Sequence, residues 1–473
     1  MRAFALLALA VGAGLAAAWA LFACSSKGAP APAPPYQATF APVDSDGHVL
    51  RDARGRTLTL RGFNVKVDPI FDVTFDDGTP PRETIPPLDA TDLALIRQNG
   101  FNVLRLPVNW SAFEPIRGQY QTTYLDRVAQ FLDVVRPFGL YVLLDFHEDG
   151  WSKWICEDGA PQWAEPPLAG PPDGGQAFGD CHASNDALNA HAAFFADQNG
   201  LQEAYAAMFT QFATRFAPDP SVLGYEIMNE PIGGDPDVQA FSVKLAQAIR
   251  AVDARHLVLW EPSAVRNIFD NAPLGSAPFP VPGAVYAVHI YTSRAGDWPT
   301  RVDDSVDHAR AEADSWGLPL MVTEYGCDSS PTDPPGATDE VDRLLDGFDR
   351  DLASSTEWIW DPGVVTRDAD GGVAYVMSGQ AGQQCLPHLA RPYAPAVGGD
   401  VTQVAWDGSA LTIAFTGHPG VPAEHDVFWN RATPSITCDG AGVTAPAPDD
   451  RGVLTVSCGS DTGSHVLVVA AGP

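Results

Sequence analysis

The chain of 473 residues can hold one large domain and a smaller one, since barrel domains often exceed about 200 residues. Lys and Arg number 28 against 59 Asp and Glu, and the net charge of −31 argues against nucleic acid as a partner, because phosphate backbones would be repelled. Charged residues are only 18% of the chain, while Gly and Pro number 43 and 42, which indicates a loop-rich exported protein rather than a disordered acidic tail.

Residues 1–23 are predicted to form a lipoprotein-type signal peptide, with one Arg, a long Ala- and Leu-rich run and small residues before Cys24. LFAC resembles a bacterial lipobox, which would make Cys24 the lipidated first residue and attach the protein to a membrane surface. The alternative is a single transmembrane anchor, because the run approaches the ~20 residues that a span needs. We therefore expect the protein in the bacterial cell envelope or secreted, with residues 24–38 as a Pro- and Ala-rich tether.

Six cysteines remain after Cys24, an even number for an oxidising compartment, which predicts three disulfides. Pairing between neighbours would give Cys156–Cys181, Cys327–Cys385 and Cys438–Cys458, although the sequence leaves other pairings open. The sequence contains no CxxC motif or His-rich cluster that would indicate a metal, and we expect no cofactor.

From about residue 57, short apolar runs alternate with amphipathic stretches, a pattern typical of β–α units around a parallel sheet. Helical patterns include 88–100, 124–139 and 201–216, where Leu201, Tyr205, Met208 and Phe212 share one face. Eight runs are predicted strands: 57–64, 101–107, 140–146, 221–227, 256–260, 284–290, 318–324 and 356–360. Eight units predict an α/β fold of the (β/α)8 TIM barrel type over residues 39–393, with an open doubly wound sheet as the alternative.

Two long loops, at about 67–87 and 148–198, are expected to be lids or binding walls, although a surface insertion without a role is the alternative. Beyond residue 395 the helical period disappears. Short strands are predicted at 411–415, 425–430, 452–458 and 464–471, which indicates a small β-sandwich over residues 394–473.

Two carboxylates carry the predicted chemistry. Glu230 follows the fourth strand in YEIMNEP (225–231), and Glu324 closes the seventh in VTEYG (322–326), so both should point into one barrel mouth. Glycoside cleavage needs a carboxylic acid that protonates the leaving oxygen and a carboxylate that attacks the anomeric carbon, about 5–5.5 Å apart in retaining enzymes. The pair therefore predicts a retaining glycosidase.

Other polar residues at strand ends would complete a sugar site. Asn229 could bind a sugar hydroxyl, Tyr291 could hold the nucleophile ionised, and a Trp face could carry a pyranose ring. Arg105 would supply the charge that keeps Glu324 deprotonated. The remaining candidates at these ends are His147, Asp149, His289, Trp358 and Trp360.

Taken together, NEP after the fourth strand, HIY after the sixth, TEYG after the seventh, and Arg105 resemble glycoside hydrolase family 5, in the retaining clan A, over residues 57–360. The resemblance implies Glu230 as acid/base and Glu324 as nucleophile. It also implies a sugar subsite shaped by Arg105, His147, Asn229, His289, Tyr291 and Trp358.

RGFNVKVDP (61–69), DFHEDGWSK (145–153), ARPYAPAVGG (390–399) and the appended sandwich are similar to endoglycoceramidases. This closer resemblance implies that Lys66 and Asp149 also touch the sugar. Two features depart from the pattern: Glu148 stands where Gln is common, and EWIWDP (357–362) replaces a Tyr-Trp run, so either Trp358 or Trp360 could carry the sugar.

We therefore expect a monomer that hydrolyses the linkage between oligosaccharide and ceramide in glycosphingolipids. The long loops would supply an apolar wall for ceramide from Ile70, Phe71, Phe75, Trp151, Trp154 and Trp163. One alternative is another β-glucosidase or endoglucanase of the same family acting on a β-glucoside. The other is a non-catalytic carbohydrate-binding surface protein, against which the intact carboxylate pair argues.

Overall fold

The computed structural model describes residues 40–71, 85–167, 181–182, 184–269, 279–291, 302–326, 337–360 and 382–472. Contacts divide the chain into residues 1–35 and 36–473, and every described residue belongs to the second unit. The predicted signal peptide, the tether and Cys24 lie outside the described residues. In the described part of the chain, no helix has both the length and the apolar character needed to cross a membrane.

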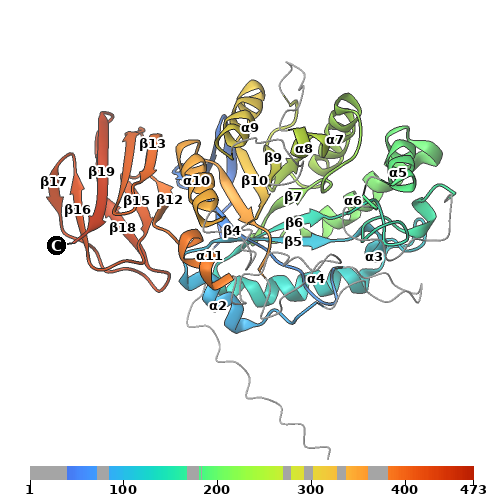
Figure 1. The fold of residues 1–473 in the computed structure, drawn as a ribbon, viewed down its shortest axis with the longest axis horizontal. Helices are drawn as coiled ribbons and strands as arrows, with labels where there is room; N and C mark the ends of the chain where they lie inside the picture. Colours follow the sequence, from blue (N-terminus) through green and yellow to red (C-terminus); the bar gives the residue numbers. More distant parts are fainter. Residues whose placement is uncertain are drawn as a thin grey trace, which may run out of the picture. The chain divides into compact units, whose positions relative to one another are not determined.

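Eight parallel strands close into a barrel, which confirms the predicted fold class (Figure 1). The strands follow one another around the barrel in chain order, and β11 pairs with β4 to close it. They are β4 (Arg61–Asn64), β5 (Val103–Val108), β6 (Tyr141–Phe146), β7 (Val222–Glu226), β8 (Leu257–Trp260), β9 (Ala284–Ile290), β10 (Leu320–Tyr325) and β11 (Ser354–Glu357).

Helices surround this barrel (Figure 1). They are α2 (Ala90–Gln98), α3 (Trp110–Phe113), α4 (Thr122–Val135), α5 (Asn185–Phe195), α6 (Leu201–Phe216), α7 (Asp235–Arg250), α8 (Val265–Phe269), α9 (Val302–Trp316), α10 (Ala337–Arg350) and α11 (Gly382–Leu389), with short 3-10 turns at Arg136–Phe138, Gln162–Ala164 and Gln198–Gly200. The predicted helices at 88–100, 124–139 and 201–216 all form. The capping box of α2 is made by Asp89 and Asp92, and the predicted face of α6 is buried.

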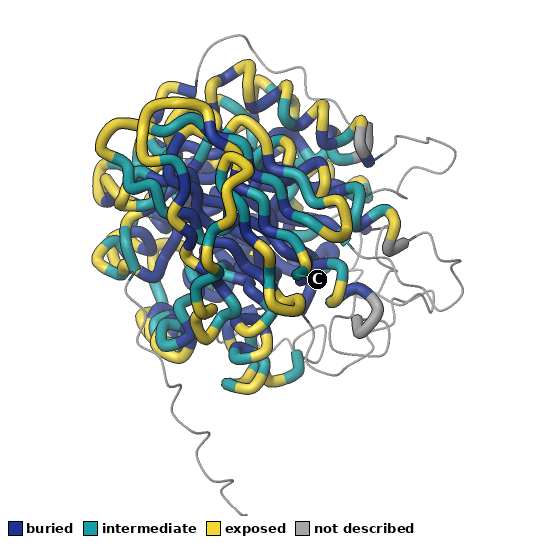
Figure 2. The backbone as a smooth tube through the Cα atoms, turned by 90° about the vertical axis from the view of Figure 1, so that its left-hand side faces the viewer, coloured by how far each residue is buried: buried dark blue, intermediate teal, exposed yellow. Residues whose placement is uncertain are grey.

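The barrel interior is apolar towards the amino ends of the strands and polar towards their carboxyl ends. Val103 and Leu143 belong to an apolar cluster, and two residues farther along the same strands stand Arg105 and Asp145, both fully buried. Side chains two apart on a strand share a face, so this change of polarity builds a polar mouth above an apolar plug. In Figure 2 the buried segments lie inside and the exposed segments form outer turns.

Two predicted strands differ from the observed ones. The run 57–64 splits into β3 (Thr57–Leu58), which joins an antiparallel sheet, and β4, which joins the barrel. The last barrel strand is Ser354–Glu357 rather than 356–360, and two of its small polar side chains are bonded inside the fold: Ser354 Oγ accepts from Leu60 N at 3.0 Å, and Thr356 Oγ1 donates to the Thr323 carbonyl at 2.6 Å.

Two antiparallel sheets form the sandwich, and their strands from β12 to β19 are orange to red in Figure 1. The first orders as β1-β2-β3-β12-β15-β18 and the second as β13-β14-β19-β16-β17. Their bounds are β1 (Asp44–Asp46), β2 (Val49–Arg51), β12 (Tyr393–Val397), β13 (Asp400–Trp406), β14 (Ala410–Thr416), β15 (Glu424–Phe428), β16 (Pro434–Cys438), β17 (Ala441–Val443), β18 (Val453–Ser457) and β19 (Ser464–Ala471). The first sheet thus also takes strands that precede the barrel, which the pattern beyond residue 395 does not reveal.

Two of the predicted disulfides are present. Cys156 pairs with Cys181 in the loop after β6, and Cys438 pairs with Cys458 in the sandwich. The third predicted pair, Cys327–Cys385, includes Cys327, which lies outside the described residues.

Candidate active site

Arg105 lies at the centre of the hydrogen-bond network in the barrel mouth. Its guanidinium donates to Glu226 Oε2 and Glu324 Oε1 at 2.6 Å each, to Asn229 Oδ1 at 2.8 Å and to Asn64 Oδ1 at 2.9 Å. Burial lowers the pKa of Arg105, but the nearby carboxylates raise it to well above its ordinary value. A permanent cation on β5 therefore ties its own strand to the carboxyl ends of β4, β7 and β10.

Glu324, on β10, faces two strong donors. Arg105 Nη1 reaches Oε1, and the Tyr291 hydroxyl donates to Oε2 at 2.6 Å. The Glu324 residue is only 5% exposed. Short hydrogen bonds from a cation and a phenol to one carboxylate suit an ionised, oriented nucleophile.

Glu230 follows β7 and approaches Glu324 through His289. His289 Nδ1 lies 2.8 Å from Glu230 Oε1 and 3.5 Å from Glu324 Oε2. The two carboxylates therefore flank the same imidazole nitrogen, close enough to act together on one glycosidic bond. Asn267 Nδ2 also donates to Glu230 Oε1, at 3.0 Å. Glu230 is the more exposed of the two glutamates, at 19% of its side chain against 7% for Glu324.

A second cluster lies beside this pair. His147 Nδ1 is 2.6 Å from Asp145 Oδ2, and its Nε2 is 3.2 Å from Asp149 Oδ2. The Trp358 ring stacks on His147 at 5.3 Å between centroids, and the Lys66 ammonium lies 5.2 Å from the Trp358 ring. An aromatic plane beside a cation and a carboxylate offers both a stacking surface and hydrogen-bond partners for a sugar.

Strong pKa shifts accompany this second cluster. Burial lowers the pKa of His147, but Asp145 and then Asp149 raise it to well above its ordinary value. Burial raises the pKa of Asp149, but hydrogen bonds from His147 and His182 bring it well below its ordinary value. Perturbed groups gathered in one mouth are typical of a functional site.

A sequence model of one family covers most of this barrel: Cellulase (glycosyl hydrolase family 5) matches residues 52–363. The chain belongs to glycosyl hydrolase family 5. This confirms the family predicted from NEP, HIY, TEYG and Arg105, and makes the protein a glycoside hydrolase.

Relatives of this family 5 hydrolase include endoglycoceramidases. Endoglycoceramidase I of Rhodococcus hoagii is 27% identical over 458 residues, which cover 88% of this chain and 86% of the relative. Endoglycoceramidase of Cyanea nozakii is 28% identical over 262 residues, 46% of this chain and 50% of the relative. The structure of endo-glycoceramidase II from Rhodococcus sp. in complex with ganglioside GM3 superposes with a TM-score of 0.73 at 23% identity, covering 90% of this chain and 100% of that chain.

The structure of the family 5 hydrolase brings most predicted site residues together. Those joined by contacts in the mouth are Lys66, Arg105, His147, Asp149, Asn229, Glu230, His289, Tyr291, Glu324 and Trp358. Trp360 is the exception. Its residue is 2% exposed, its indole N–H donates to Asp92 Oδ1 on α2 at 3.2 Å, and its ring packs against Phe63. The strand ends at Glu357, so the two-residue alternation that would place Trp358 and Trp360 on one face no longer applies.

The expected apolar wall is present only in part. Ile70, Trp151 and Trp154 are 1%, 1% and 7% exposed, and Trp151 packs against Trp110, with which it lines a small cavity beside His147 and Glu148. Trp163 donates its indole N–H to the Glu114 carbonyl at 2.8 Å. Phe71 lies at the mouth: its ring centroid is 4.7 Å from Lys66 Nζ and 5.8 Å from the centroid of the His147 ring. Phe75 lies outside the described residues.

Sequence reasoning missed five polar residues of the family 5 site, namely Asn64, Asp145, Glu226, Glu261 and Asn267. Four of them are at most 2% exposed and lie at strand ends. Glu261 Oε1 accepts from Glu230 N at 3.2 Å and lies 3.4 Å from His289 Nε2; burial, followed by Glu226, raises its pKa to well above its ordinary value. Asp145 and Glu226 could have been found, because a charged residue inside a predicted buried strand needs a charged partner.

Among the described residues, three groups have geometry compatible with a metal ion: Cys156 with Cys181 and His182; His147 with Asp149 and Asp158; and Glu226 with Glu261 and His289. The first group has no thiolate to offer, because its cysteines form a disulfide. In the second group His147 lies between Asp145 and Asp149 and Asp158 accepts from Asn109, and in the third group Glu226 accepts from Arg105.

Proposed function

We propose that this family 5 hydrolase is a retaining β-glycosidase that cleaves the bond between oligosaccharide and ceramide in glycosphingolipids. The observation that carries the catalytic part is the pair Glu230 and Glu324, whose facing oxygens both lie within 3.5 Å of His289 Nδ1. Such closeness favours direct attack by one carboxylate over activation of a water between them.

In the proposed first step, Glu230 donates its proton to the glycosidic oxygen while a Glu324 oxygen attacks the anomeric carbon. The bond to the aglycone breaks, the aglycone leaves as an alcohol, and the sugar remains esterified to Glu324. In the second step, the Glu230 carboxylate takes a proton from water, the water oxygen attacks the anomeric carbon, and the ester bond to Glu324 breaks. The sugar leaves with the configuration that it had in the substrate.

The differing surroundings of the two glutamates support this assignment of roles. Glu324 accepts hydrogen bonds from Arg105 and Tyr291, which suits a carboxylate that acts as a nucleophile. Glu230 Oε1 lies beside the His289 and Asn267 nitrogens, and the Glu230 side chain is more exposed than that of Glu324, which suits a group that exchanges protons with the leaving oxygen and with water.

Glycolipid specificity is supported by the relatives rather than by the predicted apolar wall. The relatives that carry the name endoglycoceramidase include one that aligns over 88% of this chain, and a structural neighbour was solved with ganglioside GM3. On this basis Lys66, His147, Asp149, Asn229 and Trp358 would bind the sugar next to the scissile bond. Another β-glucoside remains the alternative substrate.

The catalytic roles are tested by Glu324→Gln and Glu230→Ala. Glu324→Gln should abolish turnover, whereas Glu230→Ala should leave a slow enzyme that azide partly rescues on activated aryl glycosides, because azide needs no acid/base help. Glu312→Gln is a matched control: Glu312 is also a buried carboxylate that accepts from an arginine, Arg266, and a tyrosine, Tyr286, but it lies in the outer layer of the barrel. It should cost stability and keep turnover.

Either catalytic variant with near wild-type turnover would contradict the assignment, and so would an inverted first product observed by NMR. The substrate is tested separately with lactosylceramide or a ganglioside in detergent against soluble cello-oligosaccharides. We expect release of intact oligosaccharide and a preference of at least about a hundredfold for the lipid substrate, equivalent to ~2.7 kcal/mol in the transition state. Equal activity on the soluble glucans would leave the retaining mechanism standing and remove the lipid specificity.

We further propose that the protein is a monomer held at a bacterial membrane surface through lipidated Cys24. A lipid anchor would keep the enzyme beside glycolipid substrates. Metabolic labelling with a radioactive fatty acid should mark the wild type and leave Cys24→Ser unlabelled, and labelling of both would count against the anchor. Light scattering should give the mass of one chain.

A further inference from the structure

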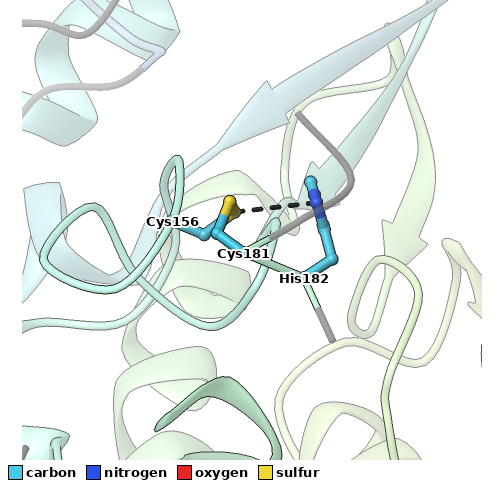
Figure 3. A group of neighbouring side chains, drawn as sticks. All are labelled: Cys156, Cys181 and His182. Atoms are coloured by element: carbon cyan, nitrogen blue, oxygen red, sulfur yellow. Dashed lines mark hydrogen bonds between the residues drawn. A yellow bond between two sulfur atoms is a disulfide. The ribbon is translucent and has the colours of Figure 1, made fainter. Parts of the chain in front are cut away.

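The long loop after β6 contains His182, a histidine that the sequence patterns do not single out. It follows Cys181 directly, and the disulfide from Cys181 to Cys156 ties it to the beginning of the same loop. Figure 3 shows the imidazole beside the disulfide, with Nδ1 3.6 Å from Cys156 Sγ. The disulfide therefore determines where this ring lies.

The other ring nitrogen of His182 reaches the sugar site. Nε2 lies 3.4 Å from Asp149 Oδ1, while the second oxygen, Oδ2, is 3.2 Å from His147 Nε2. The Asp149 carboxylate is thus held on one side by a residue at the end of β6 and on the other by a residue of the disulfide loop. A carboxylate fixed on both oxygens is already ordered before a sugar arrives, which reduces the entropy lost on binding.

Both members of this pair are charged at neutral pH. Burial lowers the pKa of His182, but Asp149, followed by Glu157 and Glu230, raises it to about 9. The side chains of His182 and Asp149 are 20% and 12% exposed. An ion pair so shielded from water is screened little by salt and holds its geometry better than a surface pair.

We propose that His182 is a positioning residue for the sugar site: the Cys156–Cys181 disulfide holds its ring against Asp149, and the ring orients that carboxylate for hydrogen bonds to the substrate sugar. The inference rests on the proposed glycosidase function, because it requires a sugar in the barrel mouth. His182 acts through Asp149 and takes no part in bond breaking. Its loss should weaken ground-state and transition-state binding alike, which raises KM and leaves kcat unchanged.

The test measures kcat, KM and Tm with lactosylceramide in detergent. His182→Gln keeps a polar side chain but removes the charge, and should raise KM about tenfold, between the effects expected for exposed and for fully buried ion pairs, with kcat within about twofold. The double variant Cys156→Ser/Cys181→Ser should raise KM by a similar factor. Adding His182→Gln to it should raise KM no further, because both changes remove the same contact.

The sandwich disulfide supplies a matched control. Cys438→Ser/Cys458→Ser removes a crosslink of similar loop length, 20 residues against 25, and should lower Tm while leaving KM unchanged. An unchanged KM in His182→Gln would overturn the inference. So would a KM in the combined variant Cys156→Ser/Cys181→Ser/His182→Gln that rises by the product of the two separate factors. If the variant lacking Cys156 and Cys181 fails to fold, the result for His182→Gln decides alone.

The wild type separates this inference from the function on which it rests. A wild-type protein without activity on any β-glycoside would overturn both. An active wild type that loses turnover in Glu324→Gln, together with an unaffected His182→Gln, would overturn only the role of His182.

Discussion

Replacing Tyr291 by Phe removes the hydrogen bond that its phenol donates to the proposed nucleophile. The phenol donates to Glu324 Oε2 at 2.6 Å, a length typical of a hydrogen bond from a hydroxyl to a carboxylate, and Arg105 continues to hold Oε1. A hydrogen bond to a charged group contributes about 1.5–3 kcal/mol, so kcat/KM should fall about 10- to 150-fold as the carboxylate becomes free to turn away from the attack geometry.

Tyr286→Phe provides the comparison, because Tyr286 lies on β9, the strand that Tyr291 directly follows, and its phenol donates to another buried carboxylate, Glu312 Oε2, at 2.8 Å. Hydrolysis of an aryl β-lactoside, followed by absorbance, measures both variants beside their thermal unfolding. Tyr286→Phe should lose stability and keep kcat/KM within about twofold, since its bond is remote from the mouth. A loss of less than about threefold in Tyr291→Phe, or an equal loss in both variants, would refute the reasoning.

Arg105→Met should cost about 3–5 kcal/mol of unfolding free energy in urea titrations, because it leaves buried carboxylates unpaired; a cost below about 1 kcal/mol would show that they repel little. Burial raises the pKa of Glu165 to about 7, so its contribution to stability is fully present below the pKa of the unfolded chain and is lost as pH rises through 7. Glu165→Gln should abolish this part of the decline in unfolding free energy between pH 4.5 and pH 8. An identical decline in both proteins would contradict this expectation. Deletion of residues 398–473 should give a chain that is insoluble or has a lower Tm, because β12 would lose its partner β15; an unchanged Tm would make the sandwich a separable module. Peptide mapping without reduction should recover Cys327–Cys385 beside the two observed disulfides, and a free thiol at Cys385 would count against that pairing.

The barrel could be predicted because its strands and helices obey simple periodicities. The strand predicted at 284–290 is observed at Ala284–Ile290, since AVYAVHI is apolar on both faces, as a strand between a barrel interior and a helical layer must be. The helix predicted at 201–216 is likewise observed over Leu201–Phe216. In both segments the local pattern and the tertiary environment require the same residues.

Prediction failed where polar side chains replace apolar ones inside the fold. The last barrel strand, SSTE, reads as a loop, yet all four of its residues are buried. The neighbouring run Trp358–Trp360 looked like the strand because it is aromatic and apolar. The strands β1 and β2 were missed and β3 was assigned to the barrel for another reason: two or three residues carry no periodicity, and the pairing of β3 with β12 is a contact between distant parts of the chain.

The meeting of Glu230, Glu324, Arg105 and Tyr291 at one barrel mouth could be predicted from their positions at strand ends, but the strained backbone and the further buried carboxylates around them could not, and the reason is energetic. Glu230 has φ of 40°, a left-handed conformation that a side chain other than glycine seldom adopts, and Trp151 in the loop after β6 has φ of 81°. Around one buried arginine, the carboxylates of Asp145, Glu226 and Glu324 are packed within 3.1 Å. Each of these features lowers stability when considered alone, so rules of local preference cannot select them. They persist because the apolar layers around the barrel hold them in place, and for this reason local rules describe the barrel well and fail at its mouth.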